Sequence, residues 1–173
     1  MHTTSTRATM FTQVTMGLAF SIAAFAGTVV TTAVAGAEPD SDLPVIADVD
    51  PADYAQPGID DYYWWTNPDG RACAASSTGV YCSVIFPDGT PEVSTDGFSG
   101  PPNSIRLTVD GTEARIGESG RPGAPALEAG YRIQFGDLSC TAAADGVACE
   151  GPGGGFSFLG GVLTRYGTEI SAN

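Results

Sequence analysis

Four cysteines in two copies of one short unit constrain the fold of this chain more than any other feature. Cys73 and Cys82 lie nine positions apart, as do Cys140 and Cys149, and each second cysteine closes a Gly-Val-x-Cys tetrapeptide. The offset between matched positions of the two units is constant, since 140 − 73 equals 149 − 82. Because glycine and small polar residues between the paired cysteines can reverse the chain, each unit predicts a β-hairpin.

The N-terminal segment has the pattern of a secretory signal peptide. Residues 16–34 form an uncharged, alanine-rich apolar run behind a short segment whose only charge is Arg7. Small residues follow, so we expect cleavage after Ala35 or Ala37, a signal peptide over 1–37 and no membrane insertion of the mature chain. The alternative is a retained anchor, since about 20 apolar residues can span a bilayer.

In an exported protein, four cysteines imply two disulfides, and three pairings are formally possible. Within a hairpin the two cysteines of one unit lie opposite each other on adjacent antiparallel strands, close enough for a bridge of normal geometry. A single solution that occurs twice also accounts for the repeat. We therefore expect the bridges Cys73–Cys82 and Cys140–Cys149.

The segment 38–61 differs in composition from the rest of the chain. It contains eight acidic residues and four prolines and no basic residue. Like charges repel each other and proline removes backbone donors, so this composition predicts a disordered acidic linker. The aspartates of 48–53 do not form an EF-hand loop, because its glycine and its distal glutamate are missing, and we expect no metal site.

From Tyr62 onward, short β-rich runs alternate with Gly, Pro, Asn and Asp. The runs 105–109 and 112–116 flank Asp110-Gly111, a strong hairpin signal, and 131–135 alternates apolar with polar residues. No stretch keeps a helical period for a dozen residues. We expect an all-β domain over 62–173, built from antiparallel hairpins, stapled by disulfides and closed as a sandwich or a barrel.

Several residues of this domain form a pattern that spans both halves. They are Trp65, Pro68, Gly70, Cys73, Gly79, Val80 and Cys82, and then Leu127, Gly130, Leu138, Cys140, Gly146, Val147, Cys149, Gly153, Gly155 and Phe156. In this pattern the chain resembles small two-disulfide domains of many exported actinobacterial proteins of uncharacterised function. The resemblance covers about residues 62–160 and implies a fold, but it implies no activity.

The residues that the mature chain lacks exclude several chemistries. Removal of the segment 1–37 leaves a chain, 38–173, with no His, Lys or Met. Ser–His triads, Cys–His dyads, His-ligated zinc and lysine Schiff bases each need a missing side chain. The six remaining arginines against 20 acids give a formal charge of −14, which opposes binding to nucleic acid or anionic lipid.

The best candidate for a ligand surface is the aromatic run Tyr62, Tyr63, Trp64 and Trp65, which directly follows two aspartates. Flat rings beside carboxylates suit sugar binding, because rings cover C–H faces while acids accept hydroxyl protons. The other interpretation is that alternate rings of a strand pack into the core. In so small a domain we expect at least one tryptophan in the core.

Together these features predict a secreted, non-catalytic β domain, extracellular or attached to the cell wall. We expect it to bind an unknown glycan or protein of the cell envelope, with no cofactor, no metal and no catalytic residues. The alternative is a carboxylate-dependent glycan hydrolase, which needs two carboxyl groups about 5–9 Å apart, one of them with a raised pKa.

Overall fold

The computed structural model describes residues 44–45, 47–117 and 123–171, and the predicted signal peptide lies outside them. The described chain forms thirteen strands and one short 3-10 helix, η1 (Pro51–Tyr54). The strands that precede residue 117 are β1 (Ala47–Val49), β2 (Tyr62–Thr66), β3 (Ala72–Ser76), β4 (Gly79–Ser83), β5 (Val93–Thr95), β6 (Phe98–Gly100), β7 (Ser104–Thr108) and β8 (Gly111–Arg115). The later strands are β9 (Tyr131–Phe135), β10 (Leu138–Ala143), β11 (Gly146–Gly151), β12 (Gly154–Leu159) and β13 (Val162–Gly167).

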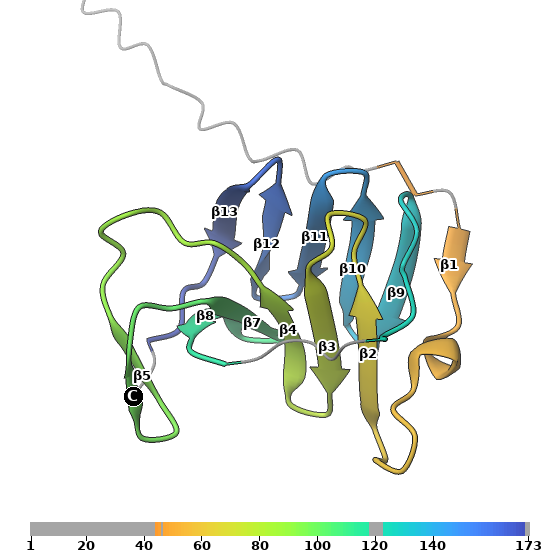
Figure 1. Ribbon diagram of the computed structural model, residues 1–173, viewed down its shortest axis with the longest axis horizontal. Helices are drawn as coiled ribbons and strands as arrows, with labels where there is room; N and C mark the ends of the chain where they lie inside the picture. Colours follow the sequence, from red (N-terminus) through yellow and green to blue (C-terminus); the bar gives the residue numbers. More distant parts are fainter. Residues whose placement is uncertain (1–43, 46, 118–122, 172–173) are drawn as a thin grey trace, which may run out of the picture. The chain divides into compact units, whose positions relative to one another are not determined.

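The strands form two large sheets and one small one (Figure 1). The six-stranded sheet has the order β1-β9-β10-β11-β12-β13, the five-stranded sheet has the order β2-β3-β4-β7-β8, and β5 pairs with β6. Neighbouring strands are antiparallel, except that β1 runs parallel to β9. The all-β fold of antiparallel hairpins is therefore confirmed.

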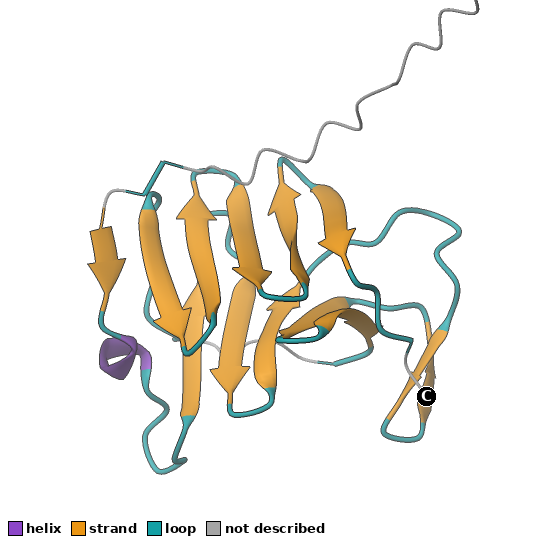
Figure 2. Cartoon of the chain, turned by 180° about the vertical axis from the view of Figure 1, so that it is seen from behind, coloured by secondary structure: helices purple, strands orange, loops and turns teal. Residues whose placement is uncertain are grey.

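The two large sheets share one hydrophobic core, which makes the domain a sandwich (Figure 2). Trp65 and Ile105 enter this core from the five-stranded sheet, and Ile133 and Phe156 enter it from the six-stranded sheet. Phe135 of β9 contacts β2 across the core, with its ring centroid 5.7 Å from that of Trp65. Alternation of side chains along each strand supplies the inward residues that fill the space between the sheets.

The sequence repeat corresponds to a repeat of topology. Strands β2-β3-β4-β7-β8 and β9-β10-β11-β12-β13 are two antiparallel meanders of five strands, and β5–β6 is an insertion in the first. Each meander carries its bridge between its second and third strands, as the spacing predicts: Cys73–Cys82 and Cys140–Cys149. The bridged residues are directly opposite in register and have Cα–Cα distances of 4.1 Å.

The glycine of each Gly-Val-x-Cys unit has a specific steric role. Gly79 and Gly146 have φ angles of +136° and +157°, which L side chains rarely adopt. A side chain at either position would collide with a backbone carbonyl of the next strand, that of Leu107 or Phe158. Glycine is therefore required at the start of both third strands.

The segment that precedes each meander pairs with the first strand of the other meander. Strand β1 precedes the first meander but pairs with β9 of the second. Conversely, Pro125–Leu127 precedes the second meander but pairs with β2, where Thr66 N–H donates to the Pro125 carbonyl and Leu127 N–H donates to the Thr66 carbonyl, both at 2.9 Å. The two halves are thus joined by reciprocal edge pairing.

The prediction of a linker over 38–61 is wrong for residues 47–61, and residues 38–43 lie outside the described part. Asp50 accepts a hydrogen bond from Ala52 N–H (2.9 Å) and caps η1, whose first residue is proline. Tyr54 is buried in the core. Asp48 accepts two hydrogen bonds from Arg132 of β9, one of them at 2.6 Å. Strand pairing, an ion pair and a buried ring therefore outweigh charge repulsion, and the domain begins no later than Ala47 rather than at Tyr62.

Candidate ligand-binding face on the five-stranded sheet

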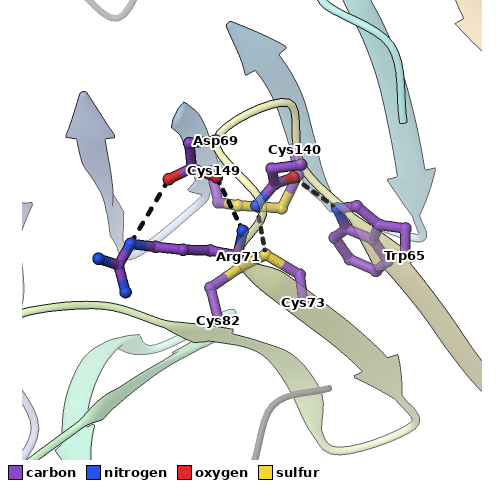
Figure 3. Close-up of a disulfide and its surroundings, with 8 residues drawn as sticks. Trp65, Asp69, Arg71, Cys73, Cys82, Cys140 and Cys149 are labelled. Carbon is purple, nitrogen blue, oxygen red and sulfur yellow. Dashed lines mark hydrogen bonds and ion pairs between the residues drawn. A yellow bond between two sulfur atoms is a disulfide. The ribbon is translucent and has the colours of Figure 1, made fainter. Parts of the chain in front are cut away.

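Strand alternation divides the four aromatic candidates between the two faces of β2. Trp65 is 0% exposed, and the ring of Tyr63 lies against Phe135 with 4.9 Å between centroids. Trp65 Nε1 donates to Asn67 Oδ1 (3.1 Å), and Asn67 Nδ2 lies 3.2 Å from Cys73 Sγ of the bridge (Figure 3). Trp65 is therefore a core residue, as expected of at least one tryptophan, and Tyr63 is half-buried and packs against the core.

Tyr62 and Trp64 lie on the outer face, with ring centroids 5.2 Å apart. Across the sheet Trp64 is opposite Ala74, and Ala74 is opposite Tyr81. Although Ala74 points outward, it is only 1% exposed, so neighbouring side chains cover it. Burial, and then the nearby Tyr81, raise the pKa of the Tyr62 hydroxyl. We call Tyr62, Trp64 and Tyr81 the aromatic face.

A pocket of about 380 Å³ adjoins this face at the edge of β2. Trp64 lines it, together with the end of η1 and the residues after it, and with residues 123–125 at the start of the segment paired with β2. We call it the Trp64 pocket, and the residues that line it are Tyr54, Ala55, Gln56, Pro57, Trp64, Gly123, Ala124 and Pro125. Asp60 and Asp61, the acids beside the aromatic run, lie exposed in the turn before β2.

Two polar groups of the pocket have distinct environments. The Tyr54 hydroxyl donates to the Ala126 carbonyl (3.3 Å), and its pKa is raised by burial and then by the charges of Asp53 and Glu128. Trp64 Nε1 is closed off from solvent and has no hydrogen-bond partner among the described residues. A buried donor without an acceptor costs roughly 1–3 kcal/mol. The indole is therefore held in place by packing rather than by hydrogen bonding.

No protein-family model, curated protein or solved structure matches this chain. The assignment of a site therefore depends on the geometry of the domain itself.

All five arginines in the described ranges form ion pairs. The partners are Asp69 for Arg71, Glu113 for Arg106, Asp96 and Glu113 for Arg115, Asp48 for Arg132, and Glu169 for Arg165. Such pairs add little stability, but they leave no uncompensated cation in this part of the protein. Arg106 also lies over the Tyr81 ring, 5.6 Å from its centroid.

The other sheet has a groove of different character on its outer face. It has a volume of about 450 Å³ and is lined by Arg132, Gln134, Asp137, Ser139, Glu150, Gly151 and Pro152. Arg132 is the counterpart of Trp64 in the second meander. Trp64 directly precedes Trp65, which is opposite Cys73, and Arg132 directly precedes Ile133, which is opposite Cys140. The two outer faces are therefore equivalent in position but not in chemistry.

Within the described residues, no group of three or more His, Cys, Asp or Glu side chains is arranged to hold a metal ion. No helix there has the length and apolar character needed to cross a bilayer.

Sequence reasoning identified Tyr62 and Trp64 of the aromatic face but missed the other residues of the Trp64 pocket. Tyr54, Gln56 and Pro57 belong to a segment interpreted as a linker, and Pro125 comes from a distant loop that follows β8. The outward position of Tyr81 could have been predicted locally, because Tyr81 lies between the buried Val80 and Cys82 on one strand. The signal for the others is tertiary and absent from any local pattern.

Proposed function

We propose that this protein is an exported, non-catalytic β-sandwich that binds a partner at the cell envelope through the aromatic face and the Trp64 pocket. The observation that supports this most is the comparison between the two meanders. Where the first has Trp64 and Tyr81, the second has Arg132 and Ala148 at the equivalent positions. The meander thus forms without rings there, so the aromatic face is not a requirement of the fold.

Export is part of the same proposal. Disulfides are typical of oxidising compartments outside the cytoplasm, and the pattern of residues 1–37 is that of a signal peptide. The chain has no lysine, so a processed protein carries one reactive amine, at its N-terminus. Amine labelling followed by peptide sequencing should find the tag on Glu38 or Gly36. A tag on Met1 of the exported protein would contradict processing.

Binding of the purified protein to isolated envelopes of the producing organism tests the function. We expect saturable binding that falls at least tenfold in a Tyr62→Ala, Trp64→Ala double variant. Phe98→Ala is the matched control, because Phe98 is 71% exposed and lies on the separate β5–β6 hairpin. Equal loss in the control, or no saturable binding, would refute the proposal. Urea unfolding of each variant would show whether it is folded.

A carboxylate-dependent glycan hydrolase is the second candidate, and one observation favours it. Asp137 and Glu150 line the same groove on the six-stranded sheet, and Ser139 Oγ lies 3.4 Å from Glu150 Oε1. If this groove is an active site, the protein should release reducing sugar from envelope glycan. Asp137→Asn and Glu150→Gln should each abolish that release, and unchanged release in both would reject the groove as the site.

A further inference from the structure

We propose that the Trp64 pocket receives an arginine or lysine side chain from a basic segment of a partner protein. This inference rests on the proposed function, because it names the chemistry of the partner that the aromatic face binds. It follows from three properties of the pocket: its aromatic lining, its charge and its small number of polar side chains.

The lining suits an organic cation. Tyr54 and Trp64 both line the pocket, and a cation near an aromatic ring is attracted by the negative potential of the ring face. The domain already uses this contact twice, since Arg71 lies 4.7 Å from the centroid of Phe158 and Arg106 lies 5.6 Å from that of Tyr81. A pocket of about 380 Å³ also has room for one long side chain.

The charges near the pocket are negative. No basic residue is among the described residues that line it, and Asp53 and Glu128 are close enough for their charges to act on the Tyr54 hydroxyl. The five arginines of the described ranges are already paired, and the sixth of the mature chain, Arg121, lies outside them. An anionic ligand would therefore meet no unpaired cation in the described part, whereas the net negative charge attracts a basic partner.

The polar groups of the pocket are few. Gln56 has the only amide side chain among the described residues of the lining, the Tyr54 hydroxyl already donates to Ala126, and Trp64 Nε1 is closed off from solvent. A neutral sugar brings several hydroxyl groups, and each costs free energy if it is buried without a partner. A lysine or arginine side chain brings an apolar stem with its polar atoms at one end, which these few partners can accommodate.

Three probes of the same length would test the proposal by calorimetry on the oxidised, exported protein. They are a Gly/Arg heptapeptide, the same peptide with citrulline in place of arginine, and a neutral N-acetylglucosamine oligomer. Citrulline keeps the shape of arginine but removes its charge. We expect binding of the arginine peptide only, with affinity falling at least tenfold in Trp64→Ala and at least threefold when salt rises from about 50 to about 500 mM.

A pair of charge variants supplies the matched control. The double variant Asp53→Asn, Glu128→Gln should weaken the arginine peptide at least threefold. The double variant Asp88→Asn, Asp145→Asn removes the same total charge at two exposed positions that do not line the pocket and should leave the affinity within twofold. Equal effects in both would show that only the net charge matters, and this would overturn the pocket as the site.

Other outcomes separate this inference from the function on which it rests. Binding of the citrulline peptide as tightly as the arginine peptide, or binding of the sugar oligomer that depends on Trp64, would overturn the cationic ligand. If envelope binding still required Trp64, the proposed function would survive that result. Conversely, Trp64-dependent binding of the arginine peptide without any envelope binding would support the pocket chemistry and refute the proposed envelope role.

Discussion

The same substitution should destabilise the protein at Trp65 but have little effect at the neighbouring Trp64. Trp65→Phe removes a buried donor and leaves Asn67 Oδ1, which now accepts from Trp65 Nε1 at 3.1 Å, without that partner. An unsatisfied buried acceptor costs roughly 1–3 kcal/mol. The void left by the smaller ring adds about 1–2 kcal/mol, because the residue is fully buried. We therefore expect the free energy of unfolding to fall by roughly 2–5 kcal/mol.

Trp64→Phe removes a buried donor that makes no hydrogen bond to any described residue, so no acceptor is left unpaired. The relief of that buried N–H offsets the loss of apolar contact at a half-buried position. The free energy of unfolding should therefore change by less than about 1 kcal/mol, in either direction. Each variant keeps one tryptophan, whose fluorescence reports unfolding.

Equilibrium urea unfolding with the disulfides intact gives both values, provided that the slope with denaturant stays the same in all three proteins. The wild-type protein and the two variants form a matched set, since the chemical change is identical. Equal losses in the two variants would refute the assignment of Trp64 to the outer face. A loss of stability confined to Trp64→Phe would also refute the hydrogen bond assigned to Trp65 Nε1.

Three further predictions concern stability. Replacing Cys140 and Cys149 together by alanine opens a loop of about ten residues and should lower the free energy of unfolding by roughly 2.5–3 kcal/mol; a loss below about 1 kcal/mol in urea would contradict this. A protein that starts at Tyr62 lacks β1 and a buried ring, so its melting temperature should fall by about 10 °C or more; an unchanged midpoint in calorimetry would restore the linker interpretation. A hydrogen bond from Arg132 holds the pKa of Asp48 below its ordinary value, so this pair contributes fully above about pH 4 and its contribution is lost as the pH falls through the lowered pKa. Asp48→Asn should flatten that acid limb of stability against pH, and an identical limb in the variant would show that the pair is not coupled to folding.

The features that could be predicted from the sequence are local ones. The disulfide pairing follows from the short, repeated spacing of the cysteines and a turn between them, and both partners belong to one hairpin. The hairpin around Asp110 was also found from its own residues. Its turn lies one position earlier than expected, since Thr108 pairs with Gly111. Gly111 belongs to β8, where the carbonyl of Thr168 approaches so closely that a side chain would collide with it.

The features that could not be predicted depend on distant partners. The acids of 48–53 look like a solvated run until Arg132, 84 positions later, is placed beside Asp48. Tyr54 looks like one ring in a polar segment until the core that buries it is known. The pocket has the same origin, because its walls come from residues 54–57 and 123–125 and only its tryptophan lies in a recognisable pattern.

If the chain is exported as proposed, the reciprocal edge pairing bears on when the domain can fold. Strand β1 emerges early from a translocation channel, yet its partner β9 begins only at Tyr131, in the last third of the chain. Likewise β8 receives the segment after β13, where Thr112 N–H donates to the Thr168 carbonyl. Contacts between such distant positions slow folding, because a long loop must close before they form. The complete sandwich of an exported chain could therefore form only after almost its whole length has crossed the membrane.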